Sequence, residues 1–207
     1  ALPEAGVMSL PAHADEPFDD ELRERIATAD AVLVGPGFDD PDQTRATLLS
    51  VADSAPARLV LDAYALGVLP QIERTLLPDE LILSPNREEL EILLGRDAGD
   101  LDDDVREAAR AQRAVVGCYG TVAHPDGRAW LADEGGAGLG TSGSGDVLAG
   151  AIAGLVARGM PSERAVVWGA WAHGRAGTRL TERIGLGFLA RDLAAELTPT
   201  VRDTLRD

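Results

Sequence analysis

The 207-residue sequence predicts an α/β protein whose central sheet is mostly parallel and covered by helices on both faces. Short apolar runs, such as AVLV at 31–34 and RLVL at 58–61, have the composition of buried strands. Stretches with helical spacing separate these runs, which is the pattern of strand–helix–strand units. No linker, repeat or low-complexity tract divides the chain, so we expect a single domain over residues 1–207.

The individual elements follow from local signals. Residues 1–20 carry three prolines and an acidic patch, and we expect an extended segment and a loop there. An Asp-Gly pair at 126–127 between two short apolar runs predicts a hairpin. The expected elements are a helix at 19–29, a strand at 31–34, a helix at 41–53, a strand at 58–61, a helical stretch at 65–77 broken by Pro70, a strand at 81–83, helices at 87–94 and 102–113, strands at 114–116, 121–123 and 129–131, a helix after the glycine run at 138–145, and helices at 162–175 and 188–197.

Polar and glycine residues follow the predicted parallel strands. In open sheets of this type, ligands bind outside the carboxyl ends of the strands. Residues 35–37 (GPG), Asp62, Asn86 and residues 117–120 (GCYG) are all predicted there. We therefore expect them to converge on one site together with the glycine run.

Composition narrows the function classes. The formal net charge is −16, which argues against nucleic acid or an anionic membrane as a partner. All 19 basic residues are Arg, so a lysine Schiff base and a P-loop lysine are excluded. Cys118 is the only cysteine, which excludes an intrachain disulfide. There is no signal peptide and no apolar run of about 18 residues, so we expect a soluble, cytoplasmic protein.

The glycine run at 138–146 (GLGTSGSGD) is the most informative stretch. A glycine-rich turn that opens a helix presents unpaired backbone N–H groups, and the helix dipole adds positive charge, so such a turn can hold phosphate. Asp146 would lie in the first helical turn, either as a helix cap or as a carboxylate facing the bound anion. The run matches the dinucleotide pattern G-x-G-x-x-G, but a hairpin precedes it and a second helix follows, so a Rossmann unit is excluded.

Two other acidic motifs have structural and functional interpretations. Aspartates at 100 and 102–104 precede a helix, and capping with a solvated face is favoured over a metal site. Asn86 either caps the helix at 87–94, or belongs to a segment in which Glu89 helps, through water, to hold Mg²⁺ bound to nucleotide phosphates. His13, His124 and His173 lack metal-ligand spacing, and a structural role is favoured for each.

Residues 140–150 (GTSGSGDVLAG) resemble the signature of the ADP/ATP-dependent NAD(P)H-hydrate dehydratases, a family of the ribokinase-like superfamily. The likeness extends along the whole chain. The other matching segments are VLVGPG at 32–37, VLDA at 60–63, SPNREE at 84–89, GTVA at 120–123, PDG at 125–127, HGRAG at 173–177 and LARDL at 189–193.

The resemblance implies a ribokinase-like three-layer sandwich, and a repair reaction in which hydrated NADH or NADPH loses water with hydrolysis of ADP or ATP. The ring hydroxyl would be phosphorylated and phosphate then eliminated, with Asp146 accepting the hydroxyl proton. The roles implied for the other residues are an anion hole formed by the N–H groups of Gly143, Ser144 and Gly145 with Thr141 and Ser142, substrate contacts from Gly37 and Asn86, nucleotide contacts from Gly117, Tyr119, Gly120 and His173, and Mg²⁺ held through water by Glu89. The resemblance also implies a homo-oligomer.

The chain departs from the family pattern at several positions. Asn86 replaces the usual His, Tyr64 replaces the second Asp of an Asp-Ala-Asp segment, and Gly117 stands where a phosphate-contacting Lys is usual. Family members also usually begin several dozen residues earlier, so this sequence is either a fragment or lacks part of the site. Two alternatives stay open: a small-molecule kinase, favoured by the N-x-x-E pattern at 86–89, and a nucleotide-binding protein without catalysis, favoured by the missing lysine.

Overall fold

A computed structural model describes residues 5–14 and 16–204. The prediction for residues 1–4 lies outside the described part. Eight α-helices and six strands are present in the described residues: α1 (Asp20–Thr28), β1 (Val32–Val34), α2 (Pro41–Asp53), β2 (Arg58–Leu61), α3 (Tyr64–Val68), β3 (Glu80–Leu83), α4 (Arg87–Leu94), α5 (Leu101–Gln112), β4 (Val115–Cys118), β5 (Thr121–Ala123), β6 (Ala129–Leu131), α6 (Ser144–Ala157), α7 (Ser162–Ile184) and α8 (Ala190–Thr204). Three short 3₁₀ turns lie at Leu69–Gln71, Arg74–Leu76 and Ala137–Gly140.

The six strands form one sheet in the order of the chain, β1-β2-β3-β4-β5-β6. The first four are parallel, with Leu61 opposite both Val34 and Leu83. The last two pair antiparallel through hairpins. The carboxyl ends of β1–β4 therefore share one edge of the sheet, as the sequence predicted.

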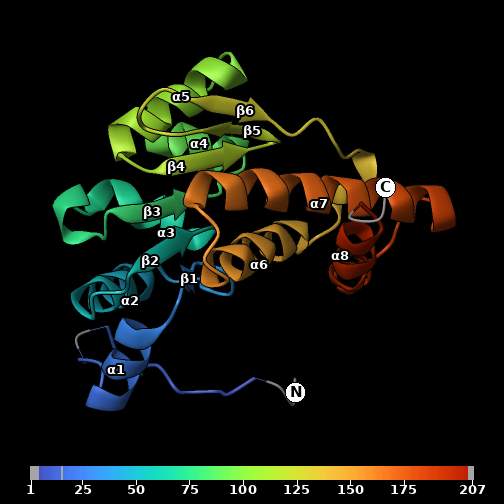
Figure 1. The fold of residues 1–207 in the computed structure, drawn as a ribbon. Coiled ribbons are helices and arrows are strands. Elements are labelled where there is room, and N and C mark those ends of the chain that lie inside the picture. The colour runs from blue at the N-terminus through green and yellow to red at the C-terminus, as the bar shows by residue number, and fades with distance from the viewer. Residues whose placement is uncertain (1–4, 15, 205–207) are drawn as a thin grey trace.

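Helices cover both faces of this sheet, which makes three layers (Figure 1). Alternate strand residues point to opposite faces because the side-chain period of a strand is two. Leu59 and Leu61 pack with helices α2–α5 in the larger core, whereas Val60 packs with Ile152 of α6 and Val166 of α7 in the smaller one. Helix α8 contributes Leu193 to a third cluster beside α7. The predicted mostly parallel three-layer fold is confirmed.

Three predicted boundaries are wrong. The strand expected at 114–116 continues to Cys118, and Tyr119-Gly120 forms a two-residue hairpin turn in which φ is +46° and +85°. The helix expected to stop at 175 continues to Ile184, because its apolar face continues through Ala176 and Leu180 and no proline interrupts it before Gly185. The last helix runs over Ala190–Thr204 rather than 188–197.

Candidate functional site

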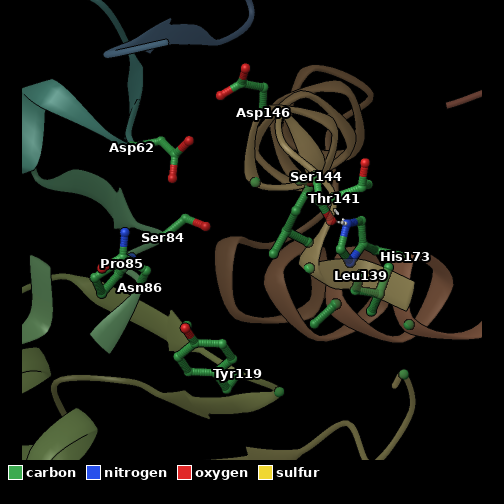
Figure 2. Close-up of a pocket in the computed structure, with 18 of the residues that line it drawn as sticks. Asp62, Ser84, Pro85, Asn86, Tyr119, Leu139, Thr141, Ser144, Asp146 and His173 are labelled. Carbon is green, nitrogen blue, oxygen red and sulfur yellow. Dashed lines mark hydrogen bonds between the residues drawn. The ribbon is translucent and has the colours of Figure 1, made fainter. Parts of the chain in front are cut away.

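A cavity of about 680 Å³ opens at the carboxyl edge of the sheet. One side, here called the strand wall, comes from the residues that follow β2, β3 and β4. The facing side, the helix wall, comes from the glycine loop, the start of α6 and one face of α7 (Figure 2). The strand wall includes Asp62, Ser84, Pro85, Asn86, Glu89, Tyr119 and Gly120, and the helix wall includes Glu134, Leu139, Thr141, Gly143, Ser144, Gly145, Asp146 and His173.

The start of α6 provides hydrogen-bond donors without a charged side chain. Gly143, the residue before the helix, has φ of +82°, and no side chain caps the helix. The N–H of Ser144 donates to the carbonyl of Thr141 at 3.1 Å, and the N–H of Val147 donates to Gly143 at 3.2 Å. Within residues 5–14 and 16–204, the N–H groups of Gly145 and Asp146 have no protein acceptor. These two donors are available to an anion at the helix N-terminus. The predicted anion hole is therefore wrong for the N–H of Ser144, which Thr141 already accepts, and stays a prediction for the N–H of Gly143.

His173 of α7 fixes this helix end from the inside. Its Nε2 lies 2.9 Å from the carbonyl oxygen of Ser144 and 3.0 Å from Ser144 Oγ. Because a carbonyl oxygen can only accept, Nε2 carries the proton and donates it. Burial lowers the pKa of His173, which favours the neutral ring. The Ser144 Oγ can therefore only accept from Nε2, so the Ser144 hydroxyl can donate its own proton to another partner.

Two glycines of α7 bring the loop after β6 against the helix. A methyl group at Gly174 would lie 2.4 Å from the carbonyl oxygen of Glu134, and one at Gly177 would lie 2.4 Å from Leu139 Cδ2. Neither glycine can carry a side chain without displacing the loop. The HGRAG segment therefore positions the loop that lines the cavity, as well as supplying His173.

Asp62 and Asp146 face the cavity from opposite walls (Figure 2). Asp62 follows β2 and is buried. Burial, reinforced by the negative charges of Glu89 and Asp146, raises the pKa of Asp62 to about 7, although the backbone amide of Ala63 acts in the opposite direction. At neutral pH this carboxyl group is thus divided between its two protonation states.

Asn86 and Glu89 form a reciprocal helix cap at the start of α4. The Asn86 Oδ1 accepts the Glu89 N–H at 2.9 Å, and Glu89 Oε2 accepts the Asn86 N–H at 2.8 Å. The capping interpretation is confirmed. Burial is the main reason that the pKa of Glu89 is raised. Both residues nevertheless line the cavity, so a cap and a ligand contact are compatible.

The turn between β4 and β5 forms the rim of the strand wall. Tyr119 is 71% exposed yet lines the cavity, and Gly120 lies beside it. Gly117 also lines the cavity but belongs to β4, where a methyl group would lie 2.4 Å from Val166 Cγ1 of α7. The close approach of α7 explains why this position holds no larger side chain.

The charge of the cavity is one-sided. In the described part of the chain, four carboxylates and no Lys or Arg line it; the carboxylates are Asp62, Glu89, Glu134 and Asp146. A bound phosphate would meet backbone and hydroxyl donors on the helix wall, but no cationic side chain.

The family model described as NAD(P)H-hydrate dehydratase matches residues 2–199. The chain belongs to this family. It is 38% identical over 216 residues to the ADP-dependent (S)-NAD(P)H-hydrate dehydratase of Xanthomonas campestris pv. campestris, covering 99% of this chain and 73% of the relative. It is 33% identical over 213 residues to the bifunctional NAD(P)H-hydrate repair enzyme Nnr of Moorella thermoacetica, covering 98% of this chain but only 39% of that longer protein.

Solved structures agree on the fold. The ADP/ATP-dependent NAD(P)H-hydrate dehydratase of Bacillus subtilis, co-crystallised with ATP/Mg²⁺ and soaked with CoA, superposes with a TM-score of 0.72 at 23% identity, over 87% of this chain and 71% of that one. A ribokinase from Thermotoga maritima gives 0.54 at 19% identity, over 85% and 59%. The ribokinase-like fold and the family resemblance predicted from the sequence are confirmed.

Most of the residues that the dehydratase resemblance singled out lie together. Gly117, Tyr119, Gly120, Thr141, His173 and the stretch 143–146 all line the cavity with Asn86 and Glu89. Ser142 and Gly37 do not line it. Gly35, in the same GPG turn as Gly37, packs against the backbone of Asp62, since a methyl group at Gly35 would lie 1.7 Å from the Asp62 carbonyl oxygen.

Some lining residues were not identified from the sequence. Glu134, Leu139 and Ala170 come from a loop and a helix face whose register only the tertiary packing sets. The sequence signal that could have found them is the spacing of Gly174 and Gly177. It indicates that another segment packs closely on this helix but does not identify that segment.

The aspartate cluster at 100–104 lies at the start of α5. Asp100 caps α5 through the N–H groups of Asp102 and Asp103, so the capping interpretation is confirmed. The solvated face expected for this cluster is wrong for Asp104, which is buried and pairs with Arg96 at 2.7 Å. Among the residues described, no group of three or more His, Cys, Asp and Glu side chains is arranged to hold a metal. No helix in that part of the chain is long and apolar enough to span a membrane.

Proposed function

We propose that this chain catalyses the ADP- or ATP-dependent dehydration of hydrated NADH and NADPH. The observation that carries the proposal is Asp146 in the first turn of α6, next to two N–H groups that have no protein acceptor, on the wall of a cavity in a member of the dehydratase family. A carboxylate beside an anion site suits a reaction in which a hydroxyl group is deprotonated and phosphorylated.

In the first step, Asp146 accepts the proton of the ring hydroxyl. The oxygen of that hydroxyl takes the terminal phosphoryl group of the nucleotide. The N–H groups of Gly145 and Asp146 and the hydroxyl of Ser144 donate to the phosphoryl oxygens. Gly143 and Thr141 shape the loop, and Ser142 belongs to it without lining the cavity. In the second step the carbon–oxygen bond breaks and phosphate leaves with its electrons, and the neighbouring ring carbon loses a proton, so the ring double bond returns.

The remaining assignments follow from position on the walls. The strand wall offers Asn86 to the substrate, and the neighbouring turn at Gly37 stays a substrate contact in the proposal. Gly117, Tyr119 and Gly120 offer a rim for the nucleotide. His173 contributes indirectly, because its Nε2 is already committed to Ser144.

A magnesium–nucleotide complex fits the residues present. Carboxylate oxygens are the ligands that Mg²⁺ prefers, and four carboxylates but no Lys or Arg line the cavity in the described residues. Because these carboxylates do not form a metal cluster by themselves in that part of the chain, the ion would enter on the nucleotide phosphates. Glu89 uses Oε2 in its cap, which leaves Oε1 to reach the ion through water. When bound, the ion would neutralise phosphate charge. That the chain acts in the cytoplasm and as a homo-oligomer also belongs to the proposal.

The test uses the full-length protein that carries this sequence. Incubation with hydrated NADH, Mg²⁺ and either ADP or ATP should restore the absorbance of the reduced nicotinamide ring, with one phosphate released per ring restored. Omission of the nucleotide is the control. No recovery of absorbance with either nucleotide would overturn the dehydratase proposal.

The kinase alternative predicts a different end point. The N-x-x-E segment at 86–89, which favours it, is a helix cap here. A kinase would consume nucleotide and leave a stable phosphorylated product without restoring the ring. Mass spectrometry of the reaction mixture therefore separates the two functions.

A further inference from the structure

Asp62 is a buried carboxylate whose charged neighbours have the same sign. It is 5% exposed and lines the cavity. The charges that act on it are those of Glu89 in α4 and Asp146 in α6. In the described residues it forms no salt bridge with Arg or His. A buried carboxylate without a cation is costly, which directs attention to a role in the cavity.

The backbone around Asp62 is held firmly. Its N–H donates to Val34 of β1 at 3.2 Å, and its carbonyl accepts the N–H of Ala65 at 3.3 Å. Gly35 presses against the same carbonyl, where only a residue without Cβ fits. Ala63 has φ of +48° and ψ of −128°, a conformation that L-residues rarely adopt. Strain of this kind persists at sites where a side chain must point in one direction.

That direction is into the cavity, opposite Asp146 (Figure 2). The proposed dehydration needs two proton acceptors at different ring atoms. The first takes the hydroxyl proton during phosphorylation, and the second takes a proton from the adjacent ring carbon when phosphate leaves. Asp146 serves the first transfer and lies beside the phosphate donors, so the second acceptor belongs on the other side of the ring.

We propose that Asp62 is the catalytic base that removes the ring carbon proton in the elimination half of the reaction. This inference rests on the proposed function. The ring nitrogen lone pair expels phosphate from the phosphorylated carbon and leaves a carbon–nitrogen double bond. Asp62 then takes a proton from the neighbouring carbon, and the electrons of that carbon–hydrogen bond form the carbon–carbon double bond. The nitrogen lone pair is restored, and protonated Asp62 passes its proton to water.

The electrostatics of the site support this role. Burial and the two nearby carboxylates raise the pKa of Asp62 to about 7, so its ionised form is a stronger base than an exposed aspartate and is present at neutral pH. The cavity is open to solvent at the exposed Tyr119 rim, which gives the proton a way out.

Single-turnover experiments separate the two halves of the reaction. Hydrated NADH is mixed with excess enzyme and Mg²⁺–ADP. Phosphoryl transfer is followed as formation of AMP, and ring restoration is followed by absorbance. Wild-type enzyme should show both. Asp62→Asn should form AMP at a similar rate but restore the ring about 10²–10⁴-fold more slowly, the usual contribution of a general base.

Controls identify the cause of any loss. Asp146→Asn should show neither event. Asp133→Asn removes an exposed carboxylate that does not line the cavity and should behave like wild type. Titration of Asp62→Asn with Mg²⁺–ADP should give the wild-type affinity. If AMP formation or affinity falls as much as ring restoration, or if ring restoration is unchanged, Asp62 is not the base. Absence of AMP with wild-type enzyme would instead overturn the proposed function.

A second measurement needs no variant. Substrate carrying deuterium on the carbon next to the hydroxylated one should slow ring restoration by wild-type enzyme about 2–6-fold relative to light substrate, which corresponds to ~0.4–1.1 kcal/mol, without slowing AMP formation. If Asp62→Asn proves unfolded, Asp62→Glu keeps the carboxylate and should restore the ring at an intermediate rate. Equal isotope effects on both events would overturn the assignment.

Discussion

The helix wall and the strand wall of the cavity differ in how their polar groups are satisfied. On the helix wall His173 satisfies the Ser144 carbonyl, and the donors of Gly145 and Asp146 are left for a ligand. On the strand wall the backbone is fixed by strand pairing, whereas the charges that act on the buried carboxylate of Asp62 are both negative. The difference indicates that the helix wall is suited to receive phosphate, whereas the strand wall holds a buried carboxylate with a raised pKa that can take up a proton.

The largest expected effect concerns Asp146, the one carboxylate of the helix wall that lies beside the phosphate donors. Asp146→Asn keeps the size of the side chain but removes the base. Turnover should fall by about 10²–10⁴-fold, while binding of ADP stays nearly unchanged. Steady-state absorbance assays and calorimetric titration measure the two effects. Near-normal turnover would show that Asp146 is only a helix-terminal residue.

The next largest effect concerns the cation. Because four carboxylates and no Lys or Arg line the cavity in the described residues, phosphate should enter together with Mg²⁺. Chelation with EDTA should weaken ADP binding at least about tenfold, or ~1.4 kcal/mol. Adenosine, which lacks phosphate, is the matched control and should bind equally under both conditions. Equal ADP affinity with and without Mg²⁺ would mean that the backbone donors suffice.

Local signals explain why much of the fold was predictable. Asp40 caps the helix whose first residue is Pro41, so α2 has the predicted bounds. The run at 58–61 is apolar and ends at Asp62, so β2 also has its predicted bounds. The glycine run and Asp146 were predictable for the same reason, because the glycines, the start of the helix and the positive end of its dipole lie within a few residues.

The remaining features depend on contacts between distant segments. Ser144 and His173 are separated by 29 positions, and nothing near either residue indicates their pairing. The negative surroundings of Asp62 depend on Glu89 of α4 and Asp146 of α6, which only the tertiary packing places near it. Tyr119-Gly120 is a hairpin turn with a bulky residue at positive φ, where Asn would have been the recognisable signal. Gly117 is explained only by Val166 packing against it.

Removal of the His173 side chain tests how the helix wall is anchored. His173→Ala leaves the buried carbonyl of Ser144 without its donor, and we expect the free energy of unfolding to fall by about 1–3 kcal/mol. A Gln side chain can place an N–H near the position of Nε2, so His173→Gln should recover part of this loss. His124→Ala, in the loop between β5 and β6, is the control for removal of a histidine. Urea denaturation measures all three. Equal losses for Ala and Gln would indicate that ring packing, not the hydrogen bond, matters.

The last expected effect concerns the strand wall and, unlike the others, is a gain in stability. The folded protein holds the Asp62 proton more tightly than the unfolded chain, since the pKa rises from 3.8 to about 7. Between these values the folded state binds more protons, so the contribution of Asp62 to stability falls as pH rises and is lowest above the folded pKa. Asp62→Asn removes the unfavourable buried charge. It should therefore stabilise the protein by about 1–3 kcal/mol near pH 8, and the gain should disappear toward pH 4.

Thermal and urea unfolding at both pH values measure the difference, with Asp133→Asn as the exposed control. A variant less stable than wild type near pH 8 would mean that the carboxylate makes a favourable contact, and the contrast between the two walls would be lost. A gain in stability with a loss of ring restoration would show that this buried charge is kept for chemistry rather than for folding.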